Sequence, residues 1–334
     1  MIYLTVIILL FLFAIFDLYV GVSNDAVNFL NSAIGSKAAK FKIVLLIVAV
    51  GVFAGAVMSN GMMDVARHGI FHPQYFTYNE LICIMLGMMT TDVVLLDVFN
   101  TLGMPTSTTI SLVFELLGGS VALAIYKTAS DPNMNFSELL NTEHALTMII
   151  AIFISVAIAF VVGMLVQYLC RLVFSFNYKK RLKYFIGIFG GLAVTTMVYF
   201  MLIKNIKGSA LMTPESTQWI TDNSSHILLG CFVVAKILMQ ILNAFKVSVL
   251  RIVVLLGTFA LAMAFASNDM VNFIGVPLAG FSAYQDFMAN AHGAAGDSYL
   301  MSSLMSSART PVIFLVIAGA IMIYSLMTSK KAQN

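Results

Sequence analysis

The chain has 334 residues, of which 60% are hydrophobic and only 10% are charged, whereas soluble domains carry about 25% charged residues. Its mean hydropathy is +0.95, and its formal net charge of +3 is small. This composition excludes a soluble globular protein and gives no support to nucleic-acid binding. We therefore expect an all-α, multi-pass integral protein of the cell membrane, surrounded by the lipid bilayer.

Apolar runs long enough to cross the hydrocarbon core, which takes about 20 residues, recur along the whole chain. At least eight candidates occur. Taken in order, the expected spans cover about residues 2–20, 43–63, 81–103, 110–126, 145–169, 184–203, 227–245, 249–266 and 312–327. The pattern leaves open whether residues 105–126 cross the membrane or form a re-entrant hairpin.

A seven-residue phrase occurs twice, as residues 23–29 (Ser-Asn-Asp-Ala-Val-Asn-Phe) and residues 267–273 (Ser-Asn-Asp-Met-Val-Asn-Phe). Six of the seven positions are identical at a constant offset of 244 (269 − 25). Each copy follows an apolar run and precedes glycine and other small residues, so we expect both helices to be interrupted inside the bilayer. Broken helices at corresponding places in two halves of a membrane protein indicate a transporter's midplane site.

Basic residues in short connections mark the cytoplasmic side of a membrane protein and test the expected order of crossings. The clusters at 37–42, 171–183, 246–251 and 330–331 all fall on one side if the spans alternate. The first phrase then lies on a helix that runs inward and the second on a helix that runs outward. This orientation predicts an inverted repeat.

Asp25 and Asp269 need a functional reason, because a charge at the bilayer centre costs about 2.5–3.5 kcal/mol on insertion scales. Carboxylate and amide oxygens, with carbonyls freed by a helix break, form a site for a hard cation. We therefore predict a cation site made by Asn24, Asp25, Asn28, Asp269 and Asn272. Sodium and a proton suit it equally well. The alternative, that these side chains only join helices, does not require the same phrase twice in opposite orientations.

A third interruption is expected at Pro105, which cannot donate a backbone hydrogen bond and is followed by four hydroxyl residues at 106–109. Hydroxyls and backbone amides at a helix break are neutral donors suited to a tetrahedral oxyanion. A plain kink in a membrane helix is an equally weighted alternative. Asp92, Asp97 and Glu115 flank this element, where they would relay protons, bind a cation, pair with one another or lie at an interface.

These elements resemble those of the inorganic phosphate transporter (PiT) family of secondary symporters. That family has two inverted Gly-x-Asn-Asp-x-x-Asn copies and a Pro-x-Ser-Thr-Thr element in each half. Residues 21–28 and 105–109 match the first half, and residues 267–272 match the second. The resemblance covers most of the chain and implies an inverted-repeat secondary transporter with discontinuous helices and a re-entrant hairpin. Its implied activity is cation-coupled symport of inorganic phosphate.

The resemblance also implies the phosphate site. Ser107, Thr108 and Thr109 of the hairpin are expected to hold phosphate together with Asp25, Asn268 and Asp269 of the broken helices. No cofactor is expected beyond sodium or a proton as the coupling ion, and no other metal. A homo-oligomer is a further expectation.

The resemblance divides the chain into a first repeat at residues 1–203, with the broken helix and the hairpin, and the start of an inverted second repeat at 204–334. No second Pro-x-Ser-Thr-Thr element follows Asp269, since residues 306–311 have the wrong order, and only 65 residues (334 − 269) follow it. We therefore expect a fragment, or a second half that another chain completes or that has been lost. The site would then be uncovered on one flank beyond Met327, and these residues alone would not transport phosphate.

Two other functions stay open from the sequence. One is a carrier of a different oxyanion such as sulfate. The other is a membrane enzyme acting on a phosphate ester, which we do not favour because the chain offers no nucleophile–base pair and no metal triad.

Overall fold

The computed structural model describes residues 2–59, 65–131, 134–174, 178–204, 213–306 and 310–328, and within these ranges it contains helices and isolated β-bridges. The α-helices are α1 (Ile2–Gly35), α2 (Phe41–Met58), α3 (Tyr78–Leu102), α4 (Thr108–Ser130), α5 (Phe136–Leu139), α6 (Thr142–Val173), α7 (Tyr178–Val198), α8 (Pro214–Asp222), α9 (Ser224–Ala244), α10 (Val249–Asn290) and α11 (Val312–Thr328). Shorter helical turns are η1 (Val65–Gly69), η2 (Pro73–Tyr75), η3 (Tyr199–Lys204) and η4 (Ser302–Met305). Eight of the described helices are long and apolar enough to cross a membrane. The all-α membrane architecture is therefore confirmed.

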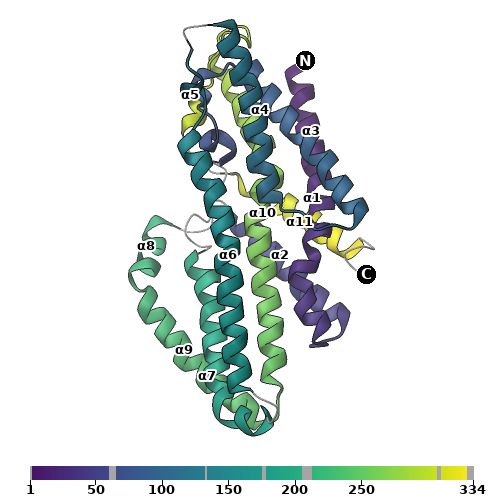
Figure 1. Cartoon of the computed structure of the whole chain (residues 1–334), viewed down its shortest axis with the longest axis vertical. Helices are drawn as coiled ribbons and strands as arrows, with labels where there is room; N and C mark the ends of the chain where they lie inside the picture. The colour runs from purple at the N-terminus through teal and green to yellow at the C-terminus, as the bar shows by residue number, and fades with distance from the viewer. Residues whose placement is uncertain are drawn as a thin grey trace.

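The two longest helices, α1 and α10, pack antiparallel through the centre of the molecule (Figure 1). Near the start of α1, the Tyr3 ring lies 5.4 Å from that of Phe287 near the end of α10. About two turns further along α1, the Phe11 ring lies 5.9 Å from that of Phe281. This pairing brings the two polar phrases, far apart in sequence, to the same height.

Helix α2 packs closely along α10, because small residues face it. Gly51 and Gly55 form a Gly-x-x-x-Gly pattern, which allows two membrane helices to approach. A Cβ added at Gly55 would lie 2.1 Å from the backbone oxygen of Met263, and one at Gly51 would lie 2.7 Å from that of Phe259. Across the other flank of α2, Gly319 of α11 lies against Ala56.

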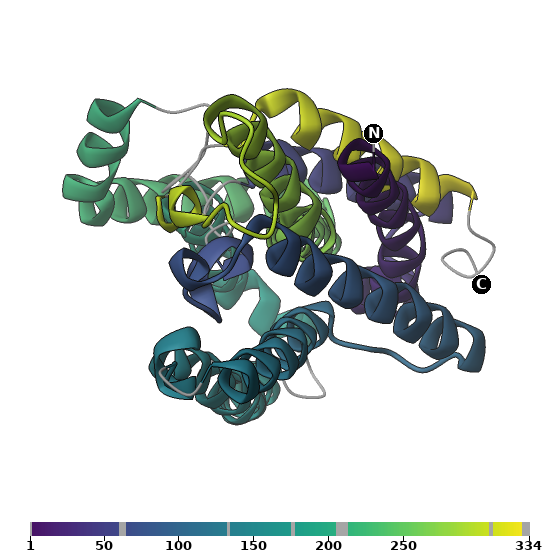
Figure 2. The ribbon, with the colours of Figure 1, turned by 90° about the horizontal axis from the view of Figure 1, so that it is seen from above.

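Helices α3 and α4 form the expected hairpin. Helix α3 ends in the left-handed Gly103 (φ 72°), the backbone conformation that glycine adopts most easily, and α4 begins after its N-cap Ser107. The turn lies at mid-height of the molecule and both open ends point the same way (Figure 1). A turn at this height fits a re-entrant hairpin, whereas whether residues 105–126 cross the whole membrane stays a prediction. Seen from above, α4 lies beside α6, on the flank away from α11 (Figure 2).

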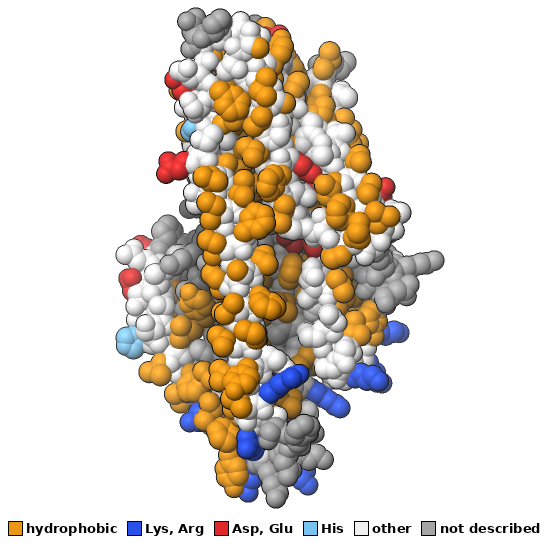
Figure 3. Space-filling view, viewed as in Figure 1, with side chains coloured by type: hydrophobic (Ala, Val, Ile, Leu, Met, Phe, Trp, Pro, Cys, Tyr) orange, Lys and Arg blue, Asp and Glu red, His pale blue; other side chains and the backbone are white. Residues whose placement is uncertain are grey.

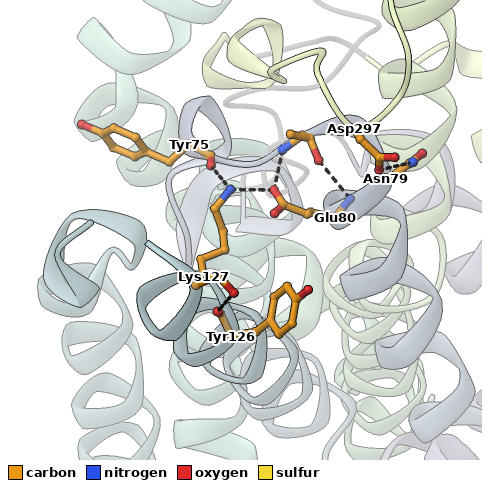
Figure 4. A network of polar contacts seen from close by, with 8 residues as sticks. Tyr75, Asn79, Glu80, Tyr126, Lys127 and Asp297 are labelled. Atoms are coloured by element: carbon orange, nitrogen blue, oxygen red, sulfur yellow. Dashed lines mark hydrogen bonds and ion pairs between the residues drawn. The ribbon is translucent and has the colours of Figure 1, made fainter. Parts of the chain in front are cut away.

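A polar network closes the open end of this hairpin (Figure 4). Lys127 Nζ of α4 donates to Glu80 Oε2 of α3 and to the Tyr75 carbonyl, each at 2.8 Å. Glu80 also caps the start of α3, since its carboxylate accepts from the Thr77 amide at 2.8 Å. The hairpin is therefore held at its base, 20 or more residues from its tip.

On the face shown in Figure 3, the visible Lys and Arg side chains gather at the opposite end of the molecule. The connections that carry Lys37 to Lys42, Arg171 to Lys183 and Lys246 all lie there (Figure 1). Placing the expected basic clusters on one side was therefore correct for these three. Lys330 and Lys331, Ser307 to Arg309 and the expected end of the second span at Met63 lie outside the described residues.

The expectation that α1 and α10 break at the two phrases is wrong. Helix α1 is continuous to Gly35, and α10 runs through both its phrase and Pro277 to Asn290. Asn and Asp cost only up to about 0.7 kcal/mol each in a helix, and proline is tolerated where neighbouring membrane helices satisfy the freed groups. A polar phrase alone therefore marks a site on a helix without ending it.

Candidate functional site

The two phrases meet where α1 and α10 cross. The carboxyl groups of Asp25 and Asp269 are within hydrogen-bonding reach of each other, and both residues are buried. Asp269 lies 20 residues after the start of α10 and 21 before its end, so the crossing is at the middle of that helix. Two negative charges at this distance repel unless a proton or a cation lies between them.

Residues on either side of the aspartates repeat the same antiparallel relation. Gly21 packs against the Phe273 ring, which a Cβ at Gly21 would approach to 2.4 Å. At the offset of 244, Gly21 corresponds to Phe265 and Phe29 to Phe273, and the rings of Phe29 and Phe265 lie 5.8 Å apart. The glycine before the first phrase is therefore needed for the second phrase to come close.

Asn24 and Asn272 hold the hairpin tip against this crossing. Asn24 Nδ2 donates to the Met104 carbonyl at 3.0 Å, and Asn24 Oδ1 accepts from the Thr106 amide at 3.1 Å. Asn272 Nδ2 contacts the hydroxyls of Thr108 and Thr109 at 2.9 and 3.1 Å. Thr108 also donates to Asp269 Oδ1 at 3.1 Å. The hairpin tip is thus hydrogen-bonded to both phrases.

These contacts enclose a pocket of about 300 Å³, room for about ten waters at about 30 Å³ each. Its polar lining comes from three elements: α1 supplies Asp25 and Asn28, α10 supplies Asn268 and Asp269, and the hairpin supplies residues 106–109. Leu261, Ala264 and Phe265 form an apolar wall. The pocket therefore joins oxygen ligands for a cation and hydroxyl donors for an anion.

The start of α4 is directed at this pocket. The Ser107 hydroxyl accepts from the Ile110 amide at 3.4 Å, which caps the helix. The first amides of a helix have no intrahelical partner, and its dipole favours a negative charge there. No lysine or arginine is among the described residues that line the pocket. An anion would thus be met by amide and hydroxyl groups and by two carboxyl groups.

All six residues predicted to hold phosphate line this one pocket: Asp25, Ser107, Thr108, Thr109, Asn268 and Asp269. Of the predicted cation ligands, Asn28 lines it too, whereas Asn24 and Asn272 do not and are bonded to the hairpin instead. Their roles as ligands stay predictions.

The prediction missed four of the described lining residues, namely Thr106 and the apolar Leu261, Ala264 and Phe265. Thr106 lies inside the hydroxyl run, which was a usable signal. Phe265 is an ordinary apolar helix residue and gave no signal.

None of the three acidic residues flanking the hairpin break lines the pocket: Asp92 is buried, and Glu115 is half-buried with both carboxylate oxygens buried. Asp92 of α3 and Glu115 of α4 lie near enough to each other and to Asp17 of α1 to interact electrostatically, whereas Asp97 is exposed. Within the described ranges, no set of three His, Cys, Asp or Glu side chains has the arrangement that holds a metal ion.

Comparison with known proteins gives two findings. A family model described as "Phosphate transporter family" matches residues 21–330. A solved structure titled "The sodium-dependent phosphate transporter" superposes with a TM-score of 0.68 at 18% identity, covering 98% of this chain and 76% of that one. No curated protein matches the chain. At this identity, the structural likeness indicates the fold alone.

Proposed function

Since the chain belongs to the phosphate transporter family, we propose that this multi-pass membrane protein carries inorganic phosphate across the bilayer by symport with a cation. The observation that carries the proposal is the mixed character of the pocket. Two carboxyl groups lie beside the capped start of α4 and its hydroxyls, and no basic side chain belongs to the part of the lining that the structure describes. Ser107, Thr108, Thr109 and Asn268 would bind the anion.

The same observation gives a physical reason for symport. Phosphate placed beside Asp25 and Asp269 meets negative charge, so its binding is unfavourable until those carboxyls are neutralised. A sodium ion held by carboxylate and amide oxygens, or a proton, would remove this repulsion. Cation and phosphate would then each raise the affinity for the other, as linkage requires.

The neighbour's printed title names sodium dependence for that protein, and sodium is our first choice of coupling ion. Its ligands would be Asp25, Asn28, Asn268 and Asp269, whose oxygens suit a hard cation. We also propose that no covalent chemistry on phosphate occurs, because the family to which the chain belongs is described as one of transporters. The chain would therefore be a carrier and not an enzyme.

The decisive experiment is uptake of labelled phosphate into proteoliposomes with sodium inside and outside replaced in turn by choline at fixed pH. We expect uptake that requires an inward sodium gradient. Competition by sulfate and arsenate tests the substrate, with arsenate competing and sulfate not. Uptake no greater than in protein-free liposomes under every ion gradient would contradict the proposal, and stronger competition by sulfate than by arsenate would reassign the oxyanion.

A further inference from the structure

We propose that Asp17, Asp92 and Glu115 form a proton-binding site, separate from the pocket at Asp25 and Asp269, where bound protons keep the α3–α4 hairpin docked on α1. The three carboxyl groups come from three elements, are near enough to interact electrostatically, and have buried oxygens without hydrogen-bond partners in the described part of the chain. We call them the acidic triad. Its role in transport rests on the proposed function, whereas proton binding itself does not.

The first step is burial. Asp17 has no exposed surface, and Asp92 is 3% exposed. Both carboxylate oxygens of Asp17, both of Glu115 and Oδ1 of Asp92 are buried and have no hydrogen-bond partner within the described part of the chain. Buried polar groups in a native structure are almost always satisfied. Five unpartnered oxygens in one place therefore indicate a ligand that the protein does not itself supply.

The second step is charge. The titratable groups that interact electrostatically with Asp17 are Asp92 of α3 and Glu115 of α4, and Asp92 also interacts with Glu115. Helices α2, α10 and α11 also pack around α1 but place no described titratable side chain against Asp17. Burial and mutual repulsion both oppose three negative charges, so the missing ligand is positive.

The third step separates a proton from a metal ion. A metal ion requires its ligands to converge at bonding distance, and no three acidic side chains within the described ranges do so. A proton needs only one carboxyl oxygen at a time and neutralises each group where it lies. The geometry therefore favours protons over sodium at the triad.

The position of the triad gives it a consequence for the pocket. Asp17 precedes Asp25 by eight residues on α1, and Glu115 follows Thr108 by seven on α4, so the triad lies about 10–12 Å from the pocket along both helices at 1.5 Å per residue. Loss of the protons would place like charges across the contact between α1 and the hairpin. The hairpin tip, which carries Ser107 to Thr109, would then be driven away from α1.

Infrared titration of the purified full chain in lipid nanodiscs, without phosphate or sodium, reads the protons directly. We expect an infrared difference spectrum at neutral pH, wild type minus the triple variant Asp17→Asn/Asp92→Asn/Glu115→Gln. It should contain the C=O stretching band of a protonated carboxylic acid. Each single variant should remove part of that band. Glu143→Gln, at an exposed position of α6, is the matched control and should leave the band unchanged.

A second measurement uses the wild type, so it does not depend on the variants folding. Dicyclohexylcarbodiimide adds to protonated carboxyls in apolar surroundings, and peptide mapping should find its adducts at the triad, fewer as the pH is raised. A difference spectrum without the acid band, together with no adducts, would overturn the proposal. Loss of the band on adding sodium at constant pH would also overturn it, because the triad would then be a cation site.

Uptake measurements separate this inference from the proposed function. If the function is correct, phosphate uptake by Glu115→Gln should depend less on pH than uptake by the wild type, while its requirement for sodium persists. If the wild type shows no uptake at any pH, the proposed function fails, yet the infrared and adduct results still decide whether protons bind.

Discussion

The pair of aspartates at the crossing of α1 and α10 is the residue-scale feature on which the proposed symport depends. Asp269 is held by Thr108 at 3.1 Å and by Asn272 at 3.3 Å, whereas Asp25 Oδ2 is buried without a hydrogen-bond partner in the described structure. The two carboxyls are therefore unequal: Asp269 is oriented by the protein, and Asp25 is available to a ligand.

Asp25→Asn keeps the shape of the side chain and removes its charge. Where sodium is the coupling ion, we expect both sodium and phosphate to bind about 10- to 100-fold more weakly, since a hydrogen bond or contact to a charged group contributes about 1.5–3 kcal/mol. Equilibrium binding and sodium-dependent uptake would measure this. Asp222→Asn, at an exposed position, serves as control. Full sodium stimulation in Asp25→Asn would show that Asp25 is no cation ligand.

Asn24 and Asn28 offer a test that separates positioning from binding. Asn24 makes two hydrogen bonds to the hairpin tip, whereas Asn28 lines the pocket. Asn24→Leu should lose about 1–3 kcal/mol of contacts to the tip at 0.5–1.5 kcal/mol each, so hydrogen exchange at residues 99–109 should rise. Asn28→Leu should lower uptake with exchange unchanged. Equal hydrogen-exchange rates at residues 99–109 in the two variants would show that Asn24 does not position the hairpin tip.

At the scale of elements, the close approach of α2 to α10 depends on glycine, which has no side chain, at positions 51 and 55. A methyl group at Gly55 would be forced against the Met263 backbone, which cannot rotate away as a side chain can. Overpacking of this kind costs about 1–3 kcal/mol. Since α10 carries the second phrase, the strain would be transmitted to the pocket.

Gly55→Ala is therefore expected to lower the temperature of unfolding in detergent, while Gly163→Ala in α6 should not, because nothing lies within 4 Å of a Cβ added there. Thermal melts followed by circular dichroism would compare the two variants. A Gly55→Ala protein as stable as the Gly163→Ala protein would mean that α2 and α10 separate at no cost.

The helix hairpin was predictable and the continuity of the long helices was not, for a physical reason. Gly103 and Pro105 together are a local signal, because glycine readily adopts the left-handed end of a helix and proline disfavours its continuation, whereas Pro277 alone does not end α10. The phrases gave no such signal. Whether the Asn24 side chain competes for its own helix backbone or bonds to a distant group depends on the position of the Met104 carbonyl, 80 residues away. In the same way, Asn272 reaches Thr108 across 164 residues. The repeated phrase located the site, but its partners come from tertiary packing.

At the scale of the whole molecule, charge is segregated along the long axis. Lys and Arg side chains gather at the end where α1 meets α2, α6 meets α7 and α9 meets α10 (Figure 3), while the closed base of the hairpin lies at the other end (Figure 1). The bias of Lys and Arg sets the orientation of membrane proteins. The hairpin should therefore enter from the side opposite the cytoplasm, and the pocket should be reached past its tip.

Single reporter cysteines test this orientation, after Cys83, Cys170 and Cys231 are replaced by serine. Ser36→Cys follows α1 at the basic end, and Ser137→Cys lies in α5 near the base of the hairpin; both positions are exposed. A membrane-impermeant maleimide added to intact cells should label Ser137→Cys, and should label Ser36→Cys only after the membrane is opened. Both sites labelled from the same side would mean that the basic end does not mark the cytoplasm. Reversed labelling would show that the protein has the opposite orientation in the membrane, and phosphate would then approach the hairpin from inside the cell.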